Sequence, residues 1–208
     1  ANPGGWLASW EAQGRQPVAR SEIVLPAATL DEYVGIYPID KTMRFTVLRR
    51  GDGLVARLTG QPFAPIFASA KDELFLKIVD AQLSFQRDAA GKITGLTLHQ
   101  SGRDIPASRD PGPVPHIEFP NSAALAEYAG EYDFGQFQPS ATISVKATPE
   151  VLLVTLTGQP AFPVFATGKD QFDYDVVVAS LSFERDAAGK VVAVVLHQNG
   201  MDMRAPKR

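Results

Sequence analysis

An internal repeat is the feature that most limits how this chain of 208 residues can fold. From Leu58 onward the two copies align without a gap, whereas before that point the second copy carries three extra residues around 134–140. Because such a repeat is one structural unit used twice, we expect two modules of the same fold. The repeated segments are 30–37 with 125–132, 58–62 with 156–160, 83–92 with 181–190, and 98–102 with 196–200.

Within each copy the side-chain pattern is typical of short β-strands joined by tight turns. Phe45 and Val47 alternate with Thr46, which is the period of two expected of a half-buried strand. Residues 88–92 and 186–190 both read Asp-Ala-Ala-Gly-Lys, which predicts a hairpin whose glycine is left-handed. We expect seven or eight strands per copy, closing as an up-and-down meander. The predicted fold class is all-β, with two tandem antiparallel meander barrels, one per repeat.

The repeat also predicts where the domains begin and end. The segment 111–115 reads Pro-Gly-Pro-Val-Pro, a stiff connector that cannot join a sheet ladder. Trp6 and Trp10 precede the repeat and either dock on a barrel or belong to a linker ordered only by its contacts. The predicted segments are an N-terminal extension or linker (1–25), a first barrel (26–110), a proline-rich connector (111–120) and a second barrel (121–208).

Helix is expected at only two corresponding places, near residues 28–33 and 122–128. Each is a single short turn that carries a leucine. We predict Thr29 and Asn121 as the N-caps, because their side-chain oxygens can accept a hydrogen bond from the first helical turn.

Composition excludes several classes of protein. The net charge is -3 with a pI near 5.6, and the basic residues are scattered, whereas a nucleic-acid partner requires clustered Lys and Arg. No run approaches the roughly 20 apolar residues that span a bilayer. The absence of cysteine excludes disulfides and thiolate metal sites. The chain begins at Ala1, as a processed mature form or a chain cut from a longer one would, and we expect an exported bacterial protein, periplasmic or secreted.

Three signatures in one order resemble a known family. They read Leu-Asp-x-Tyr-Val-Gly-x-Tyr at 30–37, Leu-Thr-Gly-Gln-Pro at 58–62 and Leu-His-Gln-x-Gly at 98–102. They resemble the accessory lipocalin-like β-barrel module that follows the catalytic domain in many β-lactamase-like serine hydrolases and related peptidases. The resemblance covers nearly all of 22–208, as two copies without that catalytic domain. It implies a barrel that holds a small apolar ligand, shapes access to a partner's active site, or mediates assembly.

Catalytic motifs are missing from the sequence. No serine has a lysine three residues later, and neither a Gly-x-Ser-x-Gly elbow nor His-Glu-x-x-His occurs. His99 and His197 remain, each near the end of a predicted strand and close to Asp104 or Asp202. Each is either a general base or ligand contact, or a histidine that hydrogen-bonds a turn. We favour the turn, because structural turns repeat faithfully.

Aromatic side chains are the best candidates for binding. The tyrosines either line a cavity and present hydroxyl groups or plug a barrel end, which we favour. The phenylalanines either fill the barrels or leave a cavity lined by rings. The candidate ligand-binding residues are Tyr33, Tyr37, Phe45, Phe67, Phe85, Tyr128, Tyr132, Phe165, Phe183, His99 and His197.

The second copy is unusually apolar. Residues 151–154, 176–178 and 191–196 are apolar on both strand faces, whereas the first copy largely alternates. Such strands predict that the outer wall of copy two is covered by copy one, by the N-terminal segment or by another subunit.

The function expected from these features is a non-enzymatic binding protein that holds a small apolar ligand in one or both barrels. The alternative is an accessory or assembly module that interacts with a serine hydrolase or self-associates, through a protein partner or a homodimer contact on the second repeat. Hydrolysis by a histidine site is the least favoured. A pocket that brings a nucleophile, a histidine and a carboxylate within hydrogen-bond reach would favour it. We expect no cofactor and no metal.

Overall fold

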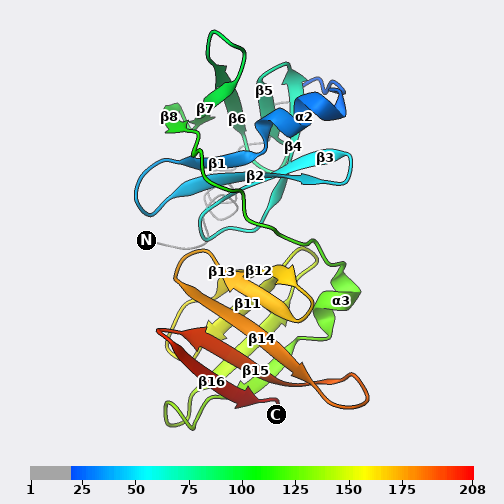
Figure 1. Cartoon of the computed structure of the whole chain (residues 1–208), viewed down its shortest axis with the longest axis vertical. Helices are drawn as coiled ribbons and strands as arrows, with labels where there is room; N and C mark the ends of the chain where they lie inside the picture. Colours follow the sequence, from blue (N-terminus) through cyan, green and yellow to red (C-terminus); the bar gives the residue numbers. More distant parts are fainter. Residues whose placement is uncertain (1–19) are drawn as a thin grey trace. The chain divides into compact units, whose positions relative to one another are not determined.

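The computed structural model describes residues 20–208 and divides the chain into two compact units between Val114 and Pro115. In each unit the strands curl around a common interior (Figure 1). The predicted fold class, two tandem antiparallel meander barrels, is confirmed. Trp6 and Trp10 lie outside the described residues, so the interpretation of that segment stays a prediction.

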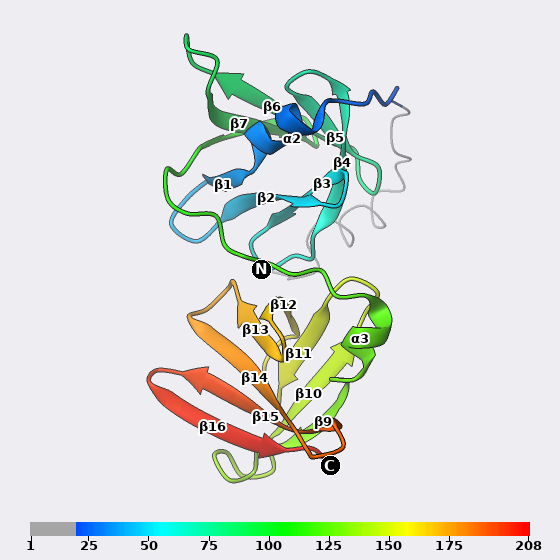
Figure 2. The same ribbon diagram turned by 45° about the vertical axis from the view of Figure 1, so that its right-hand side comes forward.

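The first unit is a meander in which every strand pairs with the next along the chain (Figure 2). All pairings are antiparallel, with register shifts of the kind made by β-bulges in β4–β5 and β6–β7. The elements are α2 (Ala27–Tyr33), β1 (Gly35–Pro38), β2 (Arg44–Arg50), β3 (Gly53–Leu58), β4 (Ala64–Ala70), β5 (Glu73–Leu76), β6 (Ala81–Arg87), β7 (Ile93–Gln100) and β8 (Arg103–Ser108).

The second unit repeats this order, with its register shifts at the corresponding places in β12–β13 and β14–β15. Its three extra residues lie in the loop between the first two strands. The elements are α3 (Ser122–Ala126), β9 (Gly130–Asp133), β10 (Thr142–Ala147), β11 (Leu152–Leu156), β12 (Phe162–Gly168), β13 (Gln171–Tyr174), β14 (Ala179–Arg185), β15 (Val191–Gln198) and β16 (Met201–Pro206).

Each meander closes through residues that follow its last strand. In the first unit the Asp110 N–H donates to the Ile36 carbonyl at 2.8 Å. In the second, Lys207 forms an antiparallel bridge with Tyr132, and the Arg208 N–H donates to the Glu131 carbonyl at 2.9 Å. These bonds join the first strand to the end of the last, so that each sheet approaches a closed barrel.

The turns follow the local chemistry of the sequence. Gly91 and Gly189 both have φ of 81°, as predicted for the β6–β7 and β14–β15 hairpins. Asn121 caps α3 by accepting the Ala124 N–H at 2.9 Å. The prediction of Thr29 as a cap is wrong: the helix begins at Ala27 behind Pro26, whose fixed φ suits the start of a helix.

Two separate hydrophobic cores fill the interiors. The first is built around Leu83, Leu96 and Phe45, and the second around Leu181, Val194 and Ile143, all almost fully buried. Because side chains alternate along a strand, these residues face inward and their neighbours face outward.

The outer walls differ from the expected alternation. In the first unit β2 and β3 are buried on both faces, including Thr46 and Arg57, so this copy does not have the solvated exterior that its pattern predicted there. In the second, Val151 and Val195 are buried although they lie outside the barrel core. Outward-facing side chains are therefore buried in parts of both copies. The alternation of apolar and polar residues along a single strand does not predict this burial.

Candidate functional site

Four of the five predicted aromatic residues of the first barrel lie together in its core. Tyr33 packs on Phe85 with ring centroids 4.7 Å apart, and Tyr37 meets the same ring edge-on at 5.6 Å. Phe45 is fully buried in the same core. Tyr33 and Tyr37 therefore both pack against the ring of Phe85 in the interior of the barrel.

The second barrel has the same arrangement. Phe183 lies between Tyr128, at 4.7 Å, and Tyr132, at 5.9 Å. Phe172 joins this group at 5.5 Å from Phe183. Phe172 belongs to the cluster although it was not among the predicted ligand-binding residues.

The buried tyrosine hydroxyls bond within their own barrel. The Tyr37 hydroxyl donates to the Tyr33 carbonyl at 2.7 Å, and the Tyr132 hydroxyl donates to the Tyr128 carbonyl at 2.5 Å. Burial raises the pKa of Tyr37 to about 12 and raises the pKa of Tyr132 further. These two hydroxyls tie the helical turn to the first strand of each barrel.

Two of the predicted aromatic residues lie apart from the barrel cores. Phe67 is half-buried, with the Lys77 ammonium 3.7 Å from its ring centroid and Phe75 6.0 Å away. Phe165 is buried but is not among the residues of the second core. Both occupy the outer face because their neighbours Ile66 and Val164 point inward.

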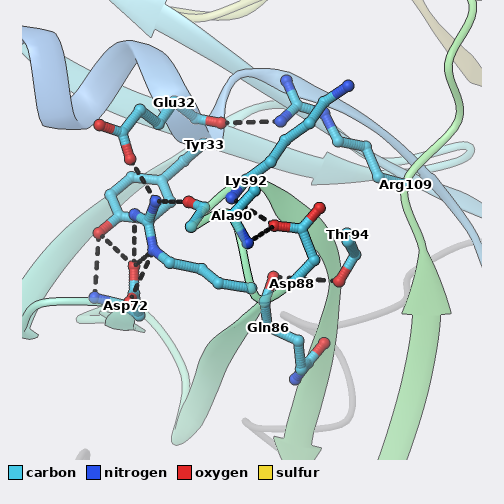
Figure 3. Close-up of polar contacts among 11 residues, drawn as sticks. Glu32, Tyr33, Asp72, Gln86, Asp88, Ala90, Lys92, Thr94 and Arg109 are labelled. Carbon is cyan, nitrogen blue, oxygen red and sulfur yellow. Dashed lines mark hydrogen bonds and ion pairs between the residues drawn. The ribbon is translucent and has the colours of Figure 1, made fainter.

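A polar cluster that the sequence analysis missed closes one end of the first barrel. Arg87 forms a two-pronged pair with the Asp72 carboxylate at 2.7 and 2.9 Å, and bonds Glu32 at 2.5 Å. Tyr33 donates to Asp72 at 2.9 Å. Figure 3 shows Glu32, Tyr33 and Asp72 converging at this point. The Arg87 guanidinium holds the pKa of Asp72 below its ordinary value of 3.8.

The second barrel carries the same cluster. Arg185 bonds Asp170 at 2.8 Å and Glu127 at 2.7 Å, and Tyr128 donates to Asp170 at 2.9 Å. We call these two groups the barrel-end clamps, made of Glu32, Tyr33, Asp72 and Arg87 in the first copy and Glu127, Tyr128, Asp170 and Arg185 in the second. The signal that could have found them is the recurrence of the same four residue types in both copies.

His99 lies on the outer wall of the first barrel, in a row that crosses four strands. Its Nε2 is 2.9 Å from Ser84 Oγ, and its Nδ1 is 2.7 Å from Asp104 Oδ1. The Ser84 hydroxyl also donates to Glu73 at 2.6 Å. Asp104 is directly opposite His99 in the β7–β8 pairing. The His99 side chain is 35% exposed, so the row can be reached by solvent.

His197 has the equivalent position in the second barrel. Its Nε2 is 2.8 Å from Ser182 Oγ, and its Nδ1 is 2.7 Å from Asp202 Oδ1. Gln171 pairs with Ser182 across β13–β14, at the place that Glu73 has in the first copy. We call these rows the outer-wall rows.

Each outer-wall row has a serine, a histidine and an aspartate in hydrogen-bond contact, the residue types and order of the triad found in serine hydrolases. The histidines were singled out from the sequence, but the serines were not. The recurring Leu-Ser-Phe at 83–85 and 181–183 is the signal that marks them. Among residues 20–208 no group of three or more His, Asp or Glu side chains is placed to hold a metal ion.

Comparison with known proteins adds one match. Residues 19–109, the first repeat and its lead-in, match the family model described as a domain of unknown function, DUF3471, which is consistent with an accessory domain. No curated protein matches the chain. Neither of the helices in residues 20–208 is long and apolar enough to cross a membrane.

Proposed function

We propose that this chain is a non-enzymatic accessory module that associates with another protein surface through its second repeat, and that a second copy of the chain provides this surface. The observation that carries the proposal is the exposed valine pair in the β13–β14 turn. Val178 is 97% exposed and its neighbour Val177 is 47% exposed. Burial of a valine side chain stabilises a structure by about 1.5–3 kcal/mol, so a contact that covers this pair has a driving force.

The same turn in the first copy is closed. Val79 is only 1% exposed, and Asp80 forms an ion pair with Arg20 at 3.1 Å. Val177 and Val178 occupy the positions of these two residues in the gapless alignment of the copies. The first turn is thus completed within its own unit, whereas the second presents apolar side chains to solvent.

The segments that lead into the two helices, around Ile23 and Glu118, explain this difference. Ile23 N–H donates to the Ala68 carbonyl at 2.9 Å, and Glu118 N–H donates to the Ala166 carbonyl at 2.8 Å, so both copies have a lead-in on β4 or β12. Three residues before each bond, the first copy has Arg20 and the second has Pro115. Pro115 has no charged side chain, and Val178 has no carboxylate. The second copy therefore cannot form the ion pair that Arg20 and Asp80 form in the first.

The packing of the aromatic rings also supports association rather than storage of a ligand. Most of the side chains proposed to hold an apolar molecule contact one another, and the tyrosine hydroxyls bond to backbone carbonyls of the same barrel. A ligand in the barrels stays a prediction, and it requires these rings to separate.

Native mass spectrometry of the full chain tests the proposal. We expect a dimer that the Val177→Ser/Val178→Ser variant dissociates, because the variant removes the apolar contact. The matched control is Ile78→Ser, at the corresponding turn of the first copy, which should leave the dimer intact. A monomeric wild-type chain, or a dimer that survives the double substitution, overturns the proposal. An apolar molecule released on denaturation from a monomer supports the barrel ligand instead.

A further inference from the structure

The two outer-wall rows contain the same serine, histidine and aspartate but differ in one neighbour. In both, the histidine Nε2 lies within 2.9 Å of the serine hydroxyl, and the histidine Nδ1 lies 2.7 Å from an aspartate. On the other side of the serine, the first row has Glu73 and the second has Gln171. A carboxylate can only accept a hydrogen bond from the serine hydroxyl, whereas an amide can also donate one.

In the first row the serine hydrogen is already used. A hydroxyl has one hydrogen to donate, and Ser84 donates it to Glu73 at 2.6 Å. His99 must then act as the donor in its contact with Ser84, which leaves no lone pair on Nε2 to receive a proton. In addition, the Glu73 carboxylate is 2.6 Å from Ser84 Oγ, and at this distance it would repel the negative charge that develops on an attacked carbonyl group.

In the second row the serine hydrogen is available to the histidine. With Asp202 accepting from Nδ1, the lone pair of His197 is on Nε2, facing Ser182 Oγ at 2.8 Å. The side chain of Gln171 is on the same face as Ser182, because paired residues share a face of the sheet. Its amide can donate a hydrogen bond, which a carboxylate cannot. The row is exposed enough to meet a reagent, since His197 is 36% exposed.

We propose that Ser182 is a covalent acylation site, which accepts an acyl group from an activated ester such as an aryl ester or a thioester, and that Ser84 is not. His197 is the general base, and Asp202 is a positioning residue that fixes its tautomer. This inference goes beyond the proposed function and does not depend on it, because it concerns a single acylation of the chain and not turnover.

The step conserves atoms and electrons. Ser182 Oγ attacks the carbonyl carbon while His197 Nε2 takes the hydroxyl proton. The bond from this carbon to the aryl oxygen or thiol sulfur then breaks with its electron pair, and the proton on Nε2 passes to the leaving group. The products are acyl-Ser182, neutral His197 and the free phenol or thiol. No oxidant, metal or cofactor takes part.

The acyl group is expected to remain on the serine. Ser182 pairs on one side with Gln171 and on the other with Val195, so the backbone around it belongs to the sheet ladder. Backbone N–H groups of the kind that form an oxyanion hole are therefore not free, and removal of one such donor costs about 10²–10³-fold in rate. Both acylation and hydrolysis lack this assistance, but acylation by an activated ester expels a good leaving group, whereas hydrolysis must expel the serine alkoxide.

The test is acylation of the full chain by p-nitrophenyl acetate, followed by intact mass and peptide mapping. We expect one acetyl group per chain, on Ser182, with release of one equivalent of nitrophenolate. Ser182→Ala should abolish this acetylation, and His197→Gln should slow it by about 10²-fold, the usual contribution of a general base. Ser84→Ala should leave it unchanged. Thermal unfolding of each variant shows that the fold is retained.

Exchange of the differing neighbour makes the test specific. Glu73→Gln should make Ser84 acetylate as Ser182 does, and Gln171→Glu should slow Ser182 by about tenfold or more, as expected from loss of a hydrogen bond to a charged group. For Asp202→Asn, a positioning role predicts a lower rate with a changed pH profile, whereas a purely structural role predicts an unchanged profile in the folded variant. Acetylation spread over lysines, equal labelling of Ser84 and Ser182, or no label on Ser182 overturns the proposal.

Discussion

In the first barrel Asp72 has a positive φ of 67° and receives hydrogen bonds from Tyr33 and Arg87, and in the second Asp170 does the same at 59°. Positions outside these clamps are not alike. Asp80 is ion-paired where Val178 is exposed, and Glu73 stands where the second copy has Gln171. The two barrels agree at the barrel ends and differ on the walls.

This difference shows which parts of the module are required by its architecture. A φ near 60° is unfavourable for a residue with a side chain, so the aspartate is held there by its bonds. Replacing Arg87 or Asp72 removes the ion pair between them and leaves the remaining charged group with fewer partners. The wall positions Asp80 and Glu73 have ordinary backbone angles and bond Arg20 and Ser84, and a change of side chain there does not affect a strained turn.

The largest expected effect tests whether the interiors are equivalent. Leu83→Ala and Leu181→Ala each remove a fully buried side chain, and each should lower the free energy of unfolding of its own barrel by about 2–5 kcal/mol. The measurement is denaturant unfolding combined with peptide-resolved hydrogen exchange. Lys92→Ala and Lys190→Ala, at exposed turn positions, are controls that should have little effect. A large loss in one barrel and none in the other would contradict the equivalence.

The clamps should give a smaller and unequal effect. Arg87 makes a two-pronged pair with Asp72, whereas Arg185 makes a single bond to Asp170. We expect Arg87→Ala to destabilise its barrel by about 2–3 kcal/mol, the range for hydrogen bonds to charged groups, and Arg185→Ala to cost less. Thermal unfolding of the two variants measures the difference. Equal losses would show that the second bond to Asp72 adds nothing to stability.

Acid should have the smallest effect. Because Arg87 lowers the pKa of Asp72 in the folded state, this carboxylate stabilises the first barrel above its ordinary pKa of 3.8. That contribution is lost as the pH falls from this value through the folded-state pKa. The unfolding free energy of wild type and of Asp72→Asn, followed from neutral to acid pH, should converge. A gap between the two that stays constant across this range would contradict the assignment.

Local sequence signals were sufficient for much of the fold. The repeat, the left-handed Gly91 and Gly189 of the hairpins and the Asn121 cap all depend on neighbouring residues, and the structure has them as predicted. The prediction of Thr29 as an N-cap was wrong because a helix can begin without a serine or threonine cap. Pro26 begins α2 without a side-chain hydrogen bond, which a search for polar caps does not detect.

The candidate sites required information that no local pattern contains. Glu32 and Arg87 are 55 positions apart, and Asp72 and Arg87 are 15 apart, so their contact depends on the register of several strands. The same is true of Ser84 and His99, which meet diagonally across β6 and β7. The histidines could be singled out because the residue type is rare in this chain, but their partners are common residues.

The closing bonds between the first and last strands also determine how the module can be multiplied. β1 lies beside the end of β8, and β9 lies beside the end of β16. Each repeat therefore starts and finishes at the same place on its barrel, the seam where the first and last strands meet. A copied gene segment can therefore add a whole barrel through a short connector, with no strand threaded through an existing one. The same seam should allow circular permutation, in which the native ends of one repeat are joined and new ends are opened in an exposed hairpin.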